Sequence, residues 1–196
     1  MRRPGGADFA PGAYVFPGGT VHAGDGEWAD EIRTAAVREL FEEVGILLAR
    51  KGGRFAGRRD CEQVRSLIAG GKTFGAALRD RGLQPAFDRL VYLARWVTPA
   101  QMRRRFDARF FLARLPAGQE IRAQEGEVTD WLWISPQRAL TTPDITLVYA
   151  TRTVLESVAD ETHPTKLFAR TRRRRDVPIV EPRIVQTENG WEIVRD

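Results

Sequence analysis

The sequence is poor in cysteine, histidine and methionine. Its 196 residues include one cysteine, two histidines and two methionines. A single cysteine excludes an internal disulfide, and Cys61, His22 and His163 are too scattered along the chain to suggest a structural zinc site. This usage of cysteine is typical of a reducing compartment, so we expect the protein in the cytoplasm.

Long apolar runs and targeting segments are also lacking. No stretch approaches the roughly 18 apolar residues of a membrane span. The opening residues, MRRPGGADFAPG, have no apolar core of the kind found in secretory signals, and the closing Val-Arg-Asp is not a peroxisomal address of the Ser-Lys-Leu type. We therefore expect no membrane partner.

The composition is that of a globular protein, with 42% hydrophobic and 29% charged residues, and residues 1–196 fit a single domain. The net charge of +5 makes an anionic partner plausible. Two arginine-rich runs, MRRRFD and ARTRRRRD, carry much of the excess charge, and such runs usually form solvated faces. No aromatic residues are interleaved with the second run, so nucleic acid is not the expected partner.

A helix is predicted over residues 31–44. Val37, Leu40, Phe41 and Val44 follow the spacing of one buried stripe, and Gly45 is a suitable C-terminal cap. Three glutamates, Glu39, Glu42 and Glu43, fall on roughly the opposite face. Because like charges at this spacing repel, we expect a cation to compensate them.

The other elements are predicted from shorter patterns. Residues 51–88 contain two short helical patterns separated by Gly70-Gly71 and are interpreted as a helical insertion or lid. Strands are predicted over 90–97, 106–115 and 128–134. Ser135-Pro136 and Thr142-Pro143 are typical helix starts, the second opening a longer helix. Residues 165–196 form a basic C-terminal arm, with edge strands or extended chain from 177 to 194.

A longer pattern surrounds the three glutamates. Phe16-Pro17-Gly18-Gly19 lies upstream, and residues 38–46 read RELFEEVGI. Together they resemble the Nudix box, which runs Gly, five residues, Glu, seven residues, then Arg-Glu-apolar-x-Glu-Glu-x-Gly-apolar. The second half of that box is present here without a mismatch.

This resemblance implies an α/β fold, the Nudix-type α/β/α sandwich with a mixed β-sheet. It also implies Mg²⁺ or Mn²⁺ as the cation, with Glu39, Glu42 and Glu43 as metal ligands and the backbone carbonyl of Gly18 or Gly19 completing the coordination. Hard oxygen ligands suit these ions. Arg38 would orient a glutamate by ion pairing, and Glu39 or Glu42 would assist deprotonation of the attacking water.

Further site residues lie outside the box. Glu127, in GEVTDWLWISP, resembles a glutamate that many family members direct at the metals, and Glu125 is its alternative. Arg104 and Arg105 are candidates for binding substrate phosphates through their planar guanidinium groups. Side chains alternate along a strand, so we expect at most one of these two arginines to face the site.

The first half of the box departs from the family pattern. Counting from Gly19 gives Asp25 at the acidic position, with twelve residues rather than seven before Arg38, whereas counting back from Arg38 gives Asp30. A five-residue insertion is the simplest interpretation, and neither aspartate receives a role. His22 stands where the most similar branch of the family typically has Asp.

That branch includes peroxisomal acyl-CoA diphosphatases of animals, and the resemblance covers most of residues 8–140. Its members cleave coenzyme A and its thioesters to 3′,5′-ADP and 4′-phosphopantetheine or its acyl derivative, which is the leading prediction here. A nucleotide sugar or dinucleotide substrate, and a noncatalytic nucleic-acid-binding role, are the alternatives. The partner is thus expected to be a small nucleoside diphosphate derivative, with a homodimer left open.

The Nudix fold also has one or more N-terminal strands before the segment that begins here at Met1. Either Met1 is an internal position of a longer protein, or the domain has lost a strand and the stability it gives. We favour the former hypothesis.

Overall fold

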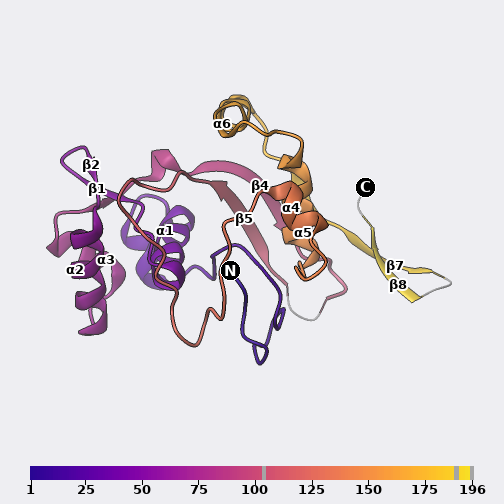
Figure 1. The fold of residues 1–196 in the computed structure, drawn as a ribbon, viewed down its shortest axis with the longest axis horizontal. Coiled ribbons are helices and arrows are strands. Elements are labelled where there is room, and N and C mark those ends of the chain that lie inside the picture. Colours follow the sequence, from indigo (N-terminus) through magenta and orange to yellow (C-terminus); the bar gives the residue numbers. More distant parts are fainter. Residues whose placement is uncertain (103–104, 188–189, 195–196) are drawn as a thin grey trace. The chain divides into compact units, whose positions relative to one another are not determined.

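The structure is a computed structural model that describes residues 1–102, 105–187 and 190–194 (Figure 1). The chain divides into two compact units. Unit 1 comprises residues 1–89 and 114–159, and unit 2 comprises residues 90–113 and 160–196. The three glutamates singled out above all belong to unit 1.

Helix α1, Glu31–Val44, has the predicted bounds. Asp30 is its N-cap and accepts a hydrogen bond from the Arg33 N–H at 2.9 Å. Gly45 ends the helix with φ of 76°, a left-handed conformation that glycine adopts without strain. Of the predicted stripe, Val37, Phe41 and Val44 are buried and Leu40 is half-buried.

The segment after α1 forms a small antiparallel sheet and two helices. Strand β1, Ala49–Lys51, lies between β2, Arg54–Phe55, and β3, Gln84–Pro85. Helices α2, Arg58–Ala69, and α3, Phe74–Asp80, confirm the two helical patterns on either side of Gly70-Gly71. A short 3-10 helix, η2, follows at Phe87–Arg89. Core side chains of this part include Leu47, Leu48, Val64, Phe74, Leu78 and Leu83.

Gln119 ties a distant segment to the end of α1. Its buried amide accepts from the Leu47 N–H at 2.8 Å and donates to the carbonyls of Leu47 and Ala56 at 2.9 and 2.6 Å. Beside it, the Arg122 N–H donates to the carbonyl of Val44 at 2.9 Å. Residues 119–124 are thereby held against the last turn of α1.

The strand predicted over 128–134 is wrong. Asp130 forms an isolated bridge with Arg2, and no longer strand is present there in the described chain. The alternation that suggested a strand leaves Trp133 68% exposed. A β-rich pattern records side-chain preference only, and a strand also requires a partner to pair with along its length.

Helix α4, Pro136–Thr141, starts as predicted, because the Ser135 hydroxyl accepts a hydrogen bond from the Arg138 N–H at 3.4 Å. The start predicted at Thr142-Pro143 is wrong. The Thr142 hydroxyl instead donates to the carbonyl of Arg138 at 2.7 Å and closes α4. The longer helix, α5, spans Tyr149–Ala159 and buries Thr151, Val154, Leu155 and Val158 among others.

Unit 2 contains a mixed sheet and a hairpin. Strand β4, Val91–Val97, pairs antiparallel with β5, Asp107–Leu112, and parallel with β6, Ile179–Val180. These strands confirm the predictions over 90–97 and, in a shorter form, over 106–115. Strands β7, Arg183–Thr187, and β8, Gly190–Val194, form an antiparallel pair. The expected basic arm also contains a helix that was not predicted, α6, Pro164–Arg173.

Among the described residues, no helix is both long and apolar enough to cross a membrane.

Candidate active site

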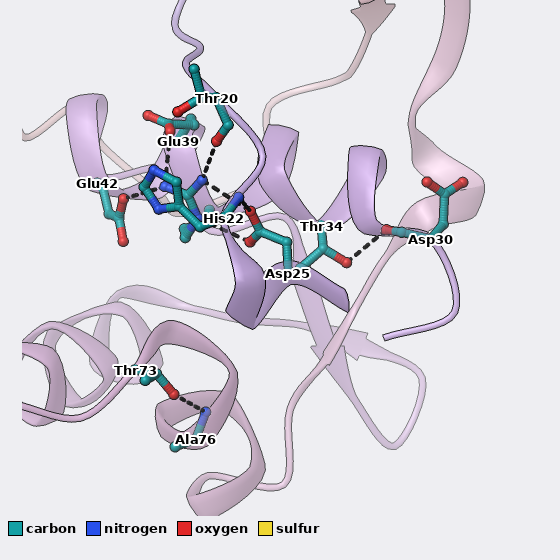
Figure 2. A network of polar contacts seen from close by, with 10 residues as sticks. Thr20, His22, Asp25, Asp30, Thr34, Glu39, Glu42, Thr73 and Ala76 are labelled. Carbon is teal, nitrogen blue, oxygen red and sulfur yellow. Dashed lines mark hydrogen bonds and ion pairs between the residues drawn. The ribbon is translucent and has the colours of Figure 1, made fainter. Parts of the chain in front are cut away.

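The guanidinium of Arg38 is the centre of a buried polar network. Figure 2 shows Thr20, Asp25, Glu39 and Glu42, which contribute the acceptors of this network. Arg38 is 6% exposed, and it donates to both carboxylate oxygens of Asp25 at 3.0 and 3.1 Å. It also donates to the carbonyl of Thr20, to Glu39 and to Glu42, each at 2.8 Å. These five contacts use the full donor capacity of an arginine side chain. Arg38 therefore fixes a loop and two helical glutamates at once.

Arg38 remains a cation despite its enclosure. Burial alone would lower its pKa, but hydrogen bonds to Asp25 and Glu42 and the charge of Glu39 raise the pKa overall. The positive charge facing Glu39 and Glu42 in this structure is thus an arginine of the same helix. Arg38 is thus ion-paired with two glutamates, and its role in orienting them for catalysis stays a prediction.

Asp25 is one of the two aspartates to which the sequence alone assigned no role. It is 2% exposed, and besides binding Arg38 it accepts a hydrogen bond from the His22 N–H at 2.8 Å. The short 3-10 helix η1, Ala23–Glu27, places it there. The count from Gly19 had identified this position, whereas Asp30, from the opposite count, serves as the N-cap of α1.

Glu43 is an acid held in a nearly dry environment. It is 5% exposed, and its carboxylate accepts a hydrogen bond from the Gly18 N–H at 2.7 Å. Burial is the largest effect on its pKa, and together with the charges of Glu39 and Glu127 it outweighs the Gly18 contact and raises that pKa to about 7. The effect of Glu127 shows that it lies within electrostatic range of Glu43.

We expect the metal-free protein to lose stability as the pH rises from about 5 to about 8. The folded state binds a proton on Glu43 with a pKa of about 7, above the ordinary value of 4.5. The unfolded chain releases that proton first, so the free energy of unfolding is fullest below pH 4.5 and falls through pH 7, by on the order of 3 kcal/mol. Denaturant unfolding with a chelator present, at a series of pH values, measures this loss.

Glu43→Gln should flatten that pH dependence, apart from a smaller slope from Glu39, whose pKa is also raised. Glu31→Gln, at the exposed start of α1, is the matched control and should keep the wild-type slope. An equal slope in Glu43→Gln and Glu31→Gln would contradict the assignment.

The glycine turn before η1 comes unusually close to Glu39. A Cβ built on Gly19 would lie 2.4 Å from the Oε1 atom of Glu39 and 2.6 Å from its Cδ atom. No side chain fits at that separation without moving the carboxylate. Burial raises the pKa of Glu39, the charge and hydrogen bond of Arg38 lower it, and the charge of Glu42 raises it further. An electrostatic contribution from the exposed His22 also lowers the pKa of Glu39.

The donor chemistry around α1 fits a hard divalent cation. Glu39, Glu42 and Glu43 each have one carboxylate oxygen bound to an N–H group, and within the described chain the second oxygen of each has no hydrogen-bond partner. Oxygen donors with a surplus of negative charge suit Mg²⁺ and Mn²⁺. No three His, Cys, Asp or Glu side chains of the described residues already converge in metal-binding geometry, so the ligand assignment stays a prediction.

The two predicted phosphate-binding arginines belong to the strand-rich part of the chain. Arg104 lies outside the described residues. Arg105 is in unit 2, where its side chain donates to the Thr98 carbonyl at 3.3 Å and faces Glu181 at 3.7 Å. Their role in binding substrate stays a prediction.

Comparison with protein families gives a match over much of the chain. The model described as the NUDT19 Nudix domain matches residues 26–148. The chain belongs to the Nudix hydrolase family. The matched segment contains α1 and Glu127 but begins one residue after Asp25, so the partner of Arg38 is identified by the structure alone.

Two relatives support this assignment. The Nudix chain is 31% identical over 140 residues to a Caenorhabditis elegans protein named "Putative nudix hydrolase 7", covering 71% of this chain and 47% of that protein. This chain thus spans about half the length of that relative. It also resembles the crystal structure of a NUDIX hydrolase from Alicyclobacillus acidocaldarius, with a TM-score of 0.72 and 27% identity over 86% of this chain and 85% of the other. The fold is therefore the α/β fold of Nudix hydrolases.

Gly19→Ala should reduce hydrolysis by this Nudix domain by roughly 10- to 100-fold, the effect typical of displacing a group that supports a metal site. The added methyl group would push the Glu39 carboxylate from its position beside Arg38. Gly24→Ala is the matched control, because a Cβ there meets nothing within 4 Å. Steady-state kinetics of both variants test the prediction, which fails if the two lose activity equally.

Proposed function

We propose that this Nudix domain hydrolyses the diphosphate linkage of coenzyme A or acyl-CoA, giving 3′,5′-ADP and 4′-phosphopantetheine or its acyl derivative. The family carries this substrate proposal, since the matched NUDT19 domain is that of a peroxisomal CoA diphosphatase family. The observation that supports the chemistry is the gathering of Glu39, Glu42 and Glu43 along one helix, with Arg38 and Gly18 fixing one oxygen of each.

Glu39, Glu42 and Glu43 would hold Mg²⁺ or Mn²⁺, with Glu127 and the carbonyl of Gly18 as further ligands. When bound, such an ion lowers the pKa of water and neutralises charge that develops on the diphosphate. The raised pKa of Glu43 is consistent with this role, because a carboxylate buried beside other acids is stabilised as an anion by a nearby cation.

Glu42 is the glutamate best placed to take a proton from the attacking water. Its side chain is 36% exposed, against 13% for Glu39, so solvent reaches it. Arg38 donates to its Oε2 atom at 2.8 Å, which leaves the Oε1 atom to accept a proton. Arg38 itself acts as a positioning residue. Arg104 and Arg105 would bind phosphate groups of the substrate.

Product analysis tests the proposal. The protein would be incubated with Mg²⁺ or Mn²⁺ and, separately, with coenzyme A, an acyl-CoA, NADH and ADP-ribose. We expect metal-dependent release of 3′,5′-ADP from the first two. Cleavage of NADH or ADP-ribose alone would replace the coenzyme A proposal with a dinucleotide or nucleotide-sugar substrate. Absence of products from all four, with the protein folded, would contradict the proposed function.

A further inference from the structure

A cavity with charged residues in its lining lies at the C-terminal end of α1. It has a volume of about 40 Å³ and is formed by α2 together with the segment that Gln119 ties down. Its walls contain three arginines and two glutamates among the lining residues Gly45, Arg58, Cys61, Glu62, Arg65, Gln119, Glu120 and Arg122. Arg58 forms an ion pair with Glu62 at 3.3 Å. The remaining charged residues of the lining are two arginines, Arg65 and Arg122, and one glutamate, Glu120. The cavity therefore has a net positive lining.

Arg65 is held there without its full set of acceptors. Its guanidinium lies over the ring of Phe41, 5.3 Å from the centroid. Its Nη1 atom is enclosed and, within the described residues, has no hydrogen-bond partner. A buried donor without an acceptor is destabilising, so the arrangement implies a missing acceptor.

Among the described residues, the neighbouring backbone does not supply that acceptor. At the end of α1 the carbonyls of Phe41, Glu43 and Val44 already accept from the N–H groups of Gly45, Gln124 and Arg122. The positive charge of Arg122 repels that of Arg65. Burial lowers the pKa of Arg65, and the charge of Arg122 lowers it further. The absence of a side chain at Gly45 permits the close approach of Arg65, because a Cβ at Gly45 would lie 2.8 Å from the Nη2 atom of Arg65.

We propose that this cavity is a phosphate-binding site in which Arg65 and Arg122 donate to the phosphate oxygens. Guanidinium groups match the geometry of phosphate and are common in such sites. A cavity of about 40 Å³ exceeds the space of one water molecule and suits a small oxyanion, with any attached nucleoside outside. Because Arg65 packs on Phe41, on the buried face of α1, this site is separate from the glutamates and extends beyond the proposed function.

Calorimetric titration of inorganic phosphate into the intact protein tests the proposal, with a chelator present and chloride holding the ionic strength constant. We expect saturable binding that Arg65→Gln weakens by roughly 10- to 100-fold, the loss expected for hydrogen bonds to a charged group. Glu120→Gln should tighten binding, because it removes the one unpaired negative charge. Arg122→Gln is a second weakening variant should Arg65→Gln fail to fold.

Two controls separate this site from general electrostatics and from the active site. Arg59→Gln removes the same charge from an exposed position of α2 and should leave affinity unchanged, as should Glu42→Gln. Adenosine 3′-monophosphate, titrated in parallel, distinguishes free phosphate from a phosphate ester: equal affinity supports the former and tighter binding the latter. No saturable binding by either ligand, or equal losses in Arg59→Gln and Arg65→Gln, would overturn the proposal.

Discussion

Glu42→Gln should lower kcat by roughly 100- to 1000-fold while the protein stays folded. Glutamine has nearly the same shape, and its amide oxygen still accepts the hydrogen bond that Arg38 donates at 2.8 Å. The substitution removes the negative charge that would hold the cation and accept the proton. Shape and packing are thus preserved, while the negative charge and one oxygen acceptor are lost.

The measurement pairs steady-state kinetics at saturating Mn²⁺ with direct titration of Mn²⁺ binding. Glu31→Gln, an exposed substitution on the same helix, should retain wild-type kcat and affinity. Addition of a chelator to the wild-type protein should abolish hydrolysis, and excess Mg²⁺ or Mn²⁺ should restore it. A Glu42→Gln variant within tenfold of wild-type kcat would remove Glu42 from the reaction.

Asp25→Ala should lower the free energy of unfolding by about 3–5 kcal/mol, the range for breaking a buried ion pair. Asp25 is 2% exposed and accepts two of the five hydrogen bonds that Arg38 donates. Alanine would leave the guanidinium buried with fewer acceptors, and the His22 N–H would lose its acceptor as well. The residual charge of Arg38 is the main cause of the loss.

Denaturant unfolding at neutral pH measures this effect, with Asp30→Ala as the comparison. Asp30 is partly exposed and caps α1, so its loss should cost about 1 kcal/mol. The double variant Asp25→Ala/Arg38→Leu should be more stable than the sum of the single losses predicts, because it removes the unpaired charge. Equal effects of Asp25→Ala and Asp30→Ala would show that Asp25 is not a structural partner of Arg38.

The helix that bears the glutamates was predictable because its signals are local. The spacing of Val37, Phe41 and Val44 defines the buried face, and Gly45 ends the helix by its own backbone preference. The role of Asp25 was not predictable, since two acidic residues compete for one position of the motif. The contact that decides between them spans thirteen residues.

Other features depend on contacts between distant segments. The pattern over 128–134 has the residues of a strand, but its pairing is limited to the bridge between Asp130 and Arg2. Helix α6 was not predicted, because its sequence is rich in arginine and its apolar side consists of few residues, among them Phe168. The phosphate-binding cavity requires α2 and Arg122 to meet, and no local pattern indicates that contact.

Because all five N–H donors of Arg38 are used, the side chains that it binds are ordered before any ion arrives. A guanidinium with five acceptors has little freedom to turn, and it restrains Glu39 and Glu42 in turn. Long side chains lose up to about 2 kcal/mol of conformational entropy when they are fixed, and here that ordering accompanies folding rather than ligand binding. An arriving ion would thus find Glu39 and Glu42 already ordered, and its affinity would depend on an arginine that does not touch it.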